Sequence, residues 1–133
     1  MPAITVTAAV LVKDKRVLAA RRRAGAHLQG LWEFPGGKLE TGETPQQCLA
    51  RELAEEFGIE TQVGRYLGES VYDYGEMTVR LLAYHVTHIS GAFALHEHDE
   101  LRWLSRAELY EVDWAPADIP LLARALSLLE AGA

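Results

Sequence analysis

Hydrophobic residues recur along this chain with a spacing of two in some segments and of three to four in others, which predicts a mixture of strands and helices. Aliphatic and β-branched residues dominate residues 4–12 and 16–22, and Asp14-Lys15 between them is typical of a turn. These two segments are therefore expected to form a β-hairpin. Further strands are predicted at residues 31–34, 61–74, 77–88 and 101–104.

The clearest helical pattern covers residues 45–57. Thr44 is expected to be the N-cap, Pro45 suits the first helical position, and Gly58 is expected to end the helix. At about 100° per residue, three glutamates fall on one side of this helix. The opposite side is apolar and carries Leu49, Ala50, Leu53, Ala54 and Phe57.

The remaining pattern predicts a helical turn at residues 105–110 and a C-terminal helix at residues 119–130, with Pro120 tolerated in its first turn. Strand-like and helix-like segments alternate without a repeat or a linker. We therefore expect one α/β domain over residues 1–133, with a mixed sheet flanked by helices.

Composition excludes several classes of protein. Hydrophobic residues make up 49% of the chain, which predicts a globular domain, and the net charge of −6 argues against binding to a nucleic acid polymer. No apolar run approaches the length of a membrane span, and the first residues do not resemble a signal peptide, so a cytoplasmic location is expected. The single cysteine, Cys48, fits a reducing compartment, and we assign it no chemistry.

The three glutamates of the first helix, Glu52, Glu55 and Glu56, are the first candidates for chemistry. Carboxylates at these spacings repel one another by a few tenths of a kcal/mol per pair, and a divalent cation would offset that repulsion. Oxygen ligands suit Mg²⁺, with Mn²⁺ as a substitute. The alternative is a solvated helix face, on which water tolerates all three charges.

The residues around this helix favour the metal site. Gly37 is followed after five residues by Glu43, and after seven more by Arg51-Glu52-Leu53-x-Glu55-Glu56-x-Gly58-Ile59. This spacing resembles the Nudix box, and the chain is identified as a member of the Nudix hydrolases. The resemblance implies an α/β/α sandwich and divalent ions held by the helix glutamates and by a carbonyl of the Gly36-Gly37 turn. It also implies that Arg51 and Glu43 pair and support the metal ligands.

Outside the box, the resemblance implies further roles for charged residues. Arg22, Arg23, His27 and Lys38 are expected near the substrate phosphates, although each could also be an ordinary loop or strand-end residue. Glu97 is expected to bind metal or to activate water, with Glu100 as the alternative. Either Glu55 or Glu97 would accept the proton of the attacking water.

Residues 31–38 and 115–122 resemble the MutT branch, which includes 8-oxo-dGTP diphosphatases and CTP pyrophosphohydrolases. This implies a monomeric or homodimeric enzyme that hydrolyses a nucleoside triphosphate to the monophosphate and pyrophosphate. Phe34, Tyr74 and Asp118 are the candidates for base recognition, and MutT has an asparagine at the position of Asp118. An ionised aspartate only accepts hydrogen bonds, so it could take them from the N4 amino group of cytosine or from the N7–H and amino groups of 8-oxoguanine. The alternative for Asp118 is a helix N-cap.

Two other functions remain open at this point. One is hydrolysis of another nucleoside diphosphate derivative, such as a sugar nucleotide or a dinucleoside polyphosphate. The other is nucleotide binding without catalysis, which the three intact carboxylates argue against.

Overall fold

The computed structural model describes residues 3–132, so the predicted domain limits, residues 1 and 133, lie outside the described residues. The helices are α1 (Pro45–Phe57) and α2 (Leu122–Glu130), and the short 3-10 turn η1 (Ile119–Leu121) precedes α2. The strands are β1 (Ala3–Lys13), β2 (Arg16–Arg22), β3 (Trp32–Glu33), β4 (Gly36–Lys38), β5 (Glu60–Asp73), β6 (Thr78–Ser90) and β7 (His98–Ser105).

The strands form one mixed sheet in the order β3-β2-β1-β6-β5, to which β4 adds by pairing with β1 and β7 by pairing with β2. β1 and β6 are parallel, and the other pairs are antiparallel. The predicted hairpin is confirmed, because Val12 lies opposite Val17 and Lys13 opposite Arg16. Asp14 and Lys15 turn the chain with φ angles of 52° and 62°.

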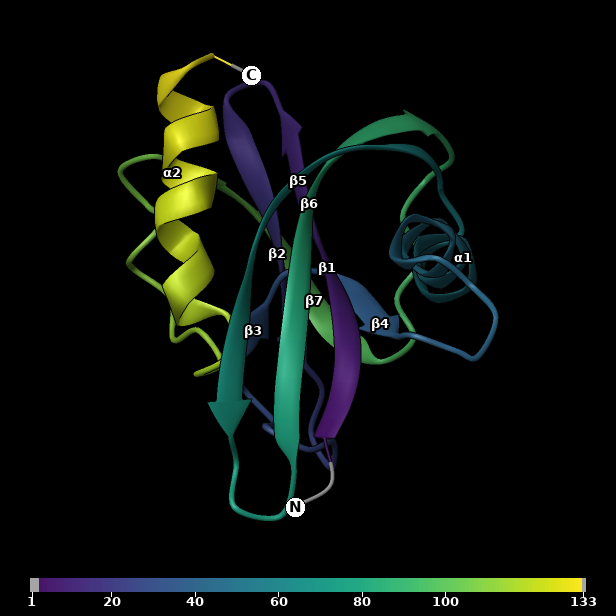
Figure 1. Cartoon of the computed structure of the whole chain (residues 1–133). Coiled ribbons are helices and arrows are strands. Elements are labelled where there is room, and N and C mark those ends of the chain that lie inside the picture. The colour runs from purple at the N-terminus through teal and green to yellow at the C-terminus, as the bar shows by residue number, and fades with distance from the viewer. Residues whose placement is uncertain (1–2, 133) are drawn as a thin grey trace.

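Each helix covers one face of the sheet (Figure 1). Successive side chains of a strand point to opposite faces, so Ala8 and Val10 of β1 pack with α2, whereas Ala9 and Leu11 pack with α1. The residues of β2 divide between the same two cores. The predicted α/β/α sandwich with a mixed sheet is therefore confirmed.

The ends of α1 are those predicted. The Thr44 side chain accepts a hydrogen bond from the backbone N–H of Gln47, whose side chain accepts one from the N–H of Thr44, so the two residues form a capping box. Gly58 ends the helix in the left-handed conformation, with φ 71°. Leu49, Leu53 and Phe57 are fully buried against the sheet, and the acidic side of the helix faces away from this core.

Four predicted elements differ from the structure. The turn predicted at Gly36-Gly37 is instead part of the strand β4, since β1 offers these residues and Lys38 a partner strand. The strand predicted at residues 101–104 extends over residues 98–105, and residues 106–110 form turns in place of a helical turn. The predicted C-terminal helix is divided, because residues 119–121 form the 3-10 turn η1 and the α-helix begins only at Leu122. Between residues 3 and 132, no helix is long and apolar enough to cross a membrane.

Candidate active site

The two glycines of β4 are required by close packing on both sides of the strand. A Cβ on Gly36 would overlap the backbone carbonyl of Thr7, and a Cβ on Gly37 would overlap the carboxyl group of Glu52. The Thr7 hydroxyl also donates a hydrogen bond to the Gly37 carbonyl, at 3.2 Å. β4 therefore brings the backbone of the predicted glycine turn directly against the acidic side of α1.

Arg51 links the acidic helix to the loop between β4 and α1. Its guanidinium donates two hydrogen bonds to the Glu43 carboxylate, at 2.7 and 3.0 Å, and one to the backbone carbonyl of Lys38, at 3.2 Å. It also donates to Glu52 at 2.9 Å and to Glu55 at 3.2 Å. The paired arrangement with Glu43 is the bidentate geometry that arginine makes with carboxylates. It fixes the guanidinium, whose remaining hydrogen bond to Glu52 holds that carboxylate in place.

The Arg51–Glu43 pair predicts how the fold responds to acid. The hydrogen bonds from Arg51, followed by the one from the Glu40 backbone, lower the pKa of Glu43 to about 2. A carboxyl group with a depressed pKa in the folded state stabilises the protein above its unfolded pKa and loses this contribution as the pH falls toward the folded pKa. We expect the melting temperature of the wild type to fall more steeply between about pH 4.5 and 2 than that of Glu43→Gln. Equal slopes, measured by circular dichroism, would contradict this pairing.

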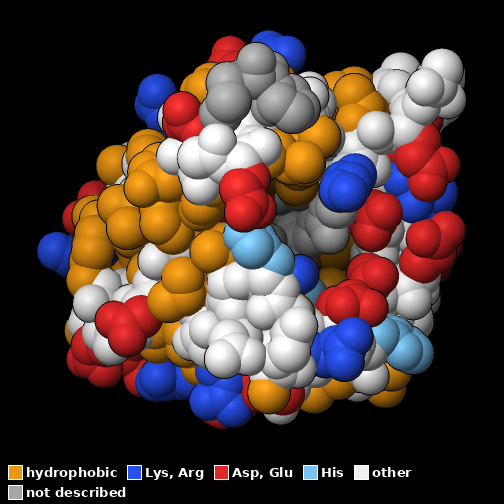
Figure 2. Space-filling view, turned by 90° about the horizontal axis from the view of Figure 1, so that it is seen from below, with side chains coloured by type: hydrophobic (Ala, Val, Ile, Leu, Met, Phe, Trp, Pro, Cys, Tyr) orange, Lys and Arg blue, Asp and Glu red, His pale blue; other side chains and the backbone are white. Residues whose placement is uncertain are grey.

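Glu52 and Glu56 face a cavity that we name the acidic hollow. Its other walls come from the loops and strands around β4: Arg22, Glu33, Gly36, Gly37, Lys38, Leu39, Glu40, Glu97 and His98. Figure 2 shows a hollow in this end of the molecule, with carboxylates gathered along one side and basic side chains at its rim. The structure thus brings the predicted Glu52, Glu56 and Glu97 to the walls of one cavity. Glu55 lies at the edge, 59% exposed and paired with Arg51.

The charges of Glu52 and Glu56 in the acidic hollow are only partly compensated by neighbouring groups. Burial raises the pKa of Glu52, and the charges of Glu56 and Glu55 raise it further, against the opposing effect of Arg51. Within the described part of the chain, Oε2 of Glu56 is buried without a hydrogen-bond partner. Over residues 3–132, no three acidic, histidine or cysteine side chains already converge on one point. An ion bound here would therefore need oxygen ligands other than side chains as well.

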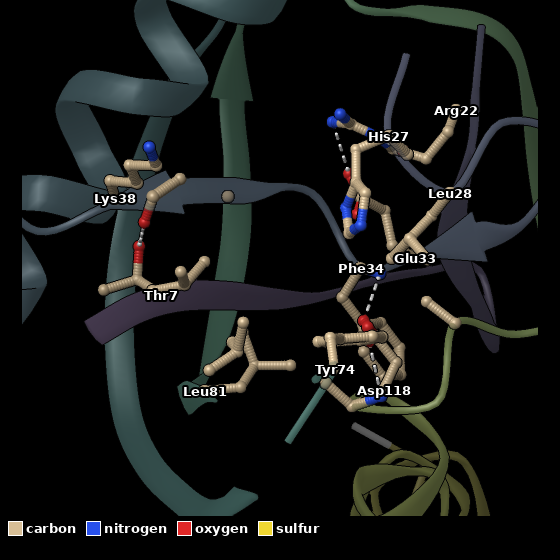
Figure 3. A pocket seen from close by; sticks show the side chains of 16 residues that line it. Thr7, Arg22, His27, Leu28, Glu33, Phe34, Lys38, Tyr74, Leu81 and Asp118 are labelled. Carbon is tan, nitrogen blue, oxygen red and sulfur yellow. Dashed lines mark hydrogen bonds and ion pairs between the residues drawn. The ribbon is translucent and has the colours of Figure 1, made fainter. Parts of the chain in front are cut away.

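A second cavity, the aromatic pocket, shares part of its lining with the acidic hollow. Figure 3 shows the side chains that line this pocket. The pocket has a volume of about 220 Å³, and its lining includes the three residues predicted to recognise a base, Phe34, Tyr74 and Asp118. Phe34 packs on Trp114 with ring centroids 4.7 Å apart, and the Tyr74 hydroxyl accepts a hydrogen bond from the backbone of Ala117 at 3.0 Å. These contacts hold the walls of the pocket in place.

Asp118 is buried in this pocket and does not act as a helix cap. Its carboxylate accepts a hydrogen bond from the backbone N–H of Phe34 at 2.9 Å, and among the described residues it makes no capping bond to η1. Asp118 stands at the N-cap position of η1, but its side chain does not make the capping bond that this position predicts. Burial, followed by the negative charge of Glu33, raises the pKa of Asp118 well above its ordinary value.

The basic residues predicted near phosphates divide into two groups. Arg22 and Lys38 line both cavities, and His27 lines the aromatic pocket, where its ring packs edge-on against Tyr74. Arg23 instead lies 52% exposed, with its Nε 3.5 Å from the Glu97 carboxylate. Glu100, the alternative to Glu97, lines neither cavity and pairs with Arg21 at 3.2 Å.

Two cavity residues were missed from the sequence. Glu33 lines both cavities, and Nε2 of the buried His98 lies 2.7 Å from its carboxylate. The two are 65 residues apart, and their approach depends on β2, which pairs with β3 on one side and with β7 on the other. Local patterns carry no signal for this contact.

Comparisons with known proteins identify the family of this chain. The family model described as NUDIX domain matches residues 1–125. The chain is 42% identical over 128 residues to the CTP pyrophosphohydrolase of Escherichia coli (strain K12), covering 96% of this chain and 95% of that protein. It is 34% identical over 112 residues to the 8-oxo-dGTP diphosphatase of the same strain, covering 84% and 87%.

Solved structures show the same fold. The solution structure of the E. coli ORF135 protein matches with a TM-score of 0.85 at 42% identity, covering 98% of this chain and 94% of that one. The predicted enzyme class is confirmed by the family match and by the relatives named as pyrophosphohydrolase and diphosphatase. The chain belongs to the Nudix family of hydrolases.

Proposed function

We propose that this Nudix hydrolase cleaves cytosine nucleoside triphosphates to the monophosphate and pyrophosphate in the presence of Mg²⁺. The observation that carries the proposal is the shared wall between the aromatic pocket and the acidic hollow. The aromatic pocket, at about 220 Å³, is smaller than cavities that hold a whole ligand, so it suits the base alone. The phosphates of the same nucleotide would then extend into the acidic hollow.

The residues of the acidic hollow fit a divalent cation. The unpartnered oxygen of Glu56 and the desolvated carboxylate of Glu52 are hard, anionic ligands of the kind that Mg²⁺ prefers. Carbonyl oxygens of Gly36 or Gly37 and oxygens of the substrate would complete the ligand set. A divalent cation supplies charge neutralisation at the phosphate oxygens and makes phosphorus more electrophilic.

The chain's own residues have separate tasks in this reaction. Lys38 and Arg22 line both cavities and would neutralise the phosphates as they pass from one to the other. Glu97 lines the acidic hollow and would accept the proton of the attacking water at its carboxylate. Glu55 is the weaker candidate for this proton, because Arg51 holds it at the exposed edge.

Asp118 would read the base. An ionised carboxylate accepts hydrogen bonds and therefore suits the N4 amino group of cytosine. The E. coli relative named CTP pyrophosphohydrolase, at 42% identity, supports this choice. A second candidate substrate is 8-oxo-dGTP, because a carboxylate can also accept hydrogen bonds from the N7–H and amino groups of 8-oxoguanine. The E. coli relative named 8-oxo-dGTP diphosphatase, at 34% identity, supports this second candidate.

The test is a screen for pyrophosphate release from CTP, dCTP, 5-methyl-dCTP, dGTP and 8-oxo-dGTP at equal concentration with Mg²⁺. We expect one or more cytosine nucleotides to give the highest kcat/KM. A higher value for 8-oxo-dGTP would select the second candidate. Release of products only from sugar nucleotides or dinucleoside polyphosphates would overturn the triphosphate assignment.

Asp118→Asn tests base reading in the same screen. Asparagine keeps an oxygen for the Phe34 N–H and adds a permanent donor, so the fold should be retained while the choice of base changes. We expect the ratio of kcat/KM for dCTP to that for 8-oxo-dGTP to fall about tenfold, which corresponds to ~1.4 kcal/mol. An unchanged ratio would contradict base recognition by this residue.

A further inference from the structure

The two cavities share part of their lining, and one shared side chain has no role so far. Of the residues that the structure describes, Arg22, Glu33, Gly36, Gly37 and Lys38 line both cavities, and Glu33 is the acidic one. If the base occupies the aromatic pocket and the phosphates occupy the acidic hollow, as proposed above, the shared wall lies beside the sugar that joins them. The inference below rests on that proposed function.

Glu33 is held at this junction from two sides. Nε2 of His98 lies 2.7 Å from its Oε2, and a guanidinium nitrogen of Arg22 lies 3.6 Å from the same oxygen. The sheet fixes this arrangement, because β2 pairs Ala20 with Glu33 on one side and Arg22 with His98 on the other. The Glu33 side chain remains 23% exposed and lines both cavities, so it is held in place and still accessible to a ligand.

His98 is fixed more firmly than the carboxylate it contacts. Its side chain is only 4% exposed, and its ring stacks on Phe57 with centroids 5.5 Å apart and planes 16° from parallel. Since an ionised carboxylate only accepts hydrogen bonds, Nε2 donates to Glu33. Its Nδ1 is buried without a partner among residues 3–132, which costs free energy. The imidazole therefore holds Glu33 in place through Nε2, while its Nδ1 is left without a hydrogen bond.

The chemistry of a carboxylate limits what it can contact in a nucleotide. It repels phosphates, and the shared wall that carries it lies between the two cavities. Sugar hydroxyls are donors, and a hydrogen bond from a hydroxyl to a carboxylate is charge-assisted and strong. We propose that the carboxylate of Glu33 accepts a hydrogen bond from a sugar hydroxyl of the bound nucleoside triphosphate, and that His98 is its positioning residue.

The test compares three sugars on the base that the screen selects: the ribonucleotide, the 2′-deoxynucleotide and the 2′,3′-dideoxynucleotide. The wild type is expected to prefer at least one hydroxylated form by about tenfold in kcat/KM over the form that lacks that hydroxyl. In Glu33→Ala the two kcat/KM values should lie within about twofold of each other. The hydroxylated substrate loses its hydrogen bond to Glu33, whereas the substrate without the hydroxyl has no such bond to lose. His98→Ala should reduce the same ratio partly, and His98→Gln, which keeps a donor, should restore some of it.

The matched control is Glu69→Ala, which removes a glutamate of β5 that pairs with Arg80 of β6 and lines neither cavity. It should leave all three rates and their ratios unchanged. Unchanged sugar ratios in Glu33→Ala would overturn the proposal, as would a loss of base preference with the sugar ratios intact.

Failure of the proposed function would look different. A wild type that hydrolyses none of the triphosphates overturns that function, and the sugar ratios are then read from dissociation constants measured by calorimetry with Mg²⁺. Turnover with sugar ratios that do not depend on Glu33 overturns the role of Glu33 alone. Absence of both binding and turnover overturns both.

Discussion

Glu56→Gln is expected to lower kcat with Mg²⁺ about 10³-fold and to leave the fold intact. Glutamine has the same shape as glutamate but no charge, so the buried oxygen that now lacks a partner would no longer offer an anionic ligand. A loss of ~4 kcal/mol of transition-state stabilisation corresponds to this factor. The measurement is pyrophosphate release under saturating substrate and Mg²⁺.

Thermal unfolding separates loss of the ion from loss of the fold. A cation that binds the folded state raises the melting temperature, so Mg²⁺ should stabilise the wild type and have little effect on Glu56→Gln. In EDTA the two proteins should melt within a few degrees of each other. Glu111→Gln, which removes the same charge at an exposed position, is the control. A Glu56→Gln variant as active as the wild type would mean that the catalytic assignment is wrong.

The elements that sequence could predict are those whose causes are local. The bounds of α1 follow from Thr44, Pro45 and Gly58, each of which acts within one turn of the helix, and the structure has the same bounds. The hairpin between β1 and β2 follows from a two-residue turn in the same way. By contrast, β4 forms because β1 supplies its partner strand from about 30 residues earlier, and the glycines of β4 indicated only a turn.

The same distinction applies to the site. The spacing from Gly37 to Glu56 predicted which residues would gather near the helix, because the box is continuous in sequence. The contacts of Asp118 and Glu33 join residues 84 and 65 positions apart, so only the folded sheet reveals them. Asp118 also shows that the residue type alone can mislead. Aspartate before a helix commonly caps it, yet here the side chain lies buried in the wall of the aromatic pocket.

Gly37→Ala is expected to lower kcat/KM about 10²-fold, corresponding to ~2.7 kcal/mol. The added methyl group would occupy the space of the Glu52 carboxyl group, which must then rotate away from the acidic hollow. A flexible side chain can move more easily than a strand, so the effect should fall on activity more than on stability. Steady-state kinetics and melting temperature, measured on the same preparation, test this.

Gly36→Ala provides the matched comparison, since it adds the same methyl group one residue earlier on β4. There the obstacle is the backbone carbonyl of Thr7, which cannot move without breaking the pairing of β4 with β1. Gly36→Ala should therefore lower the melting temperature by more than Gly37→Ala, with activity lost together with the fold. If Gly37→Ala keeps full activity, the position of the Glu52 carboxylate against β4 is not required for the reaction.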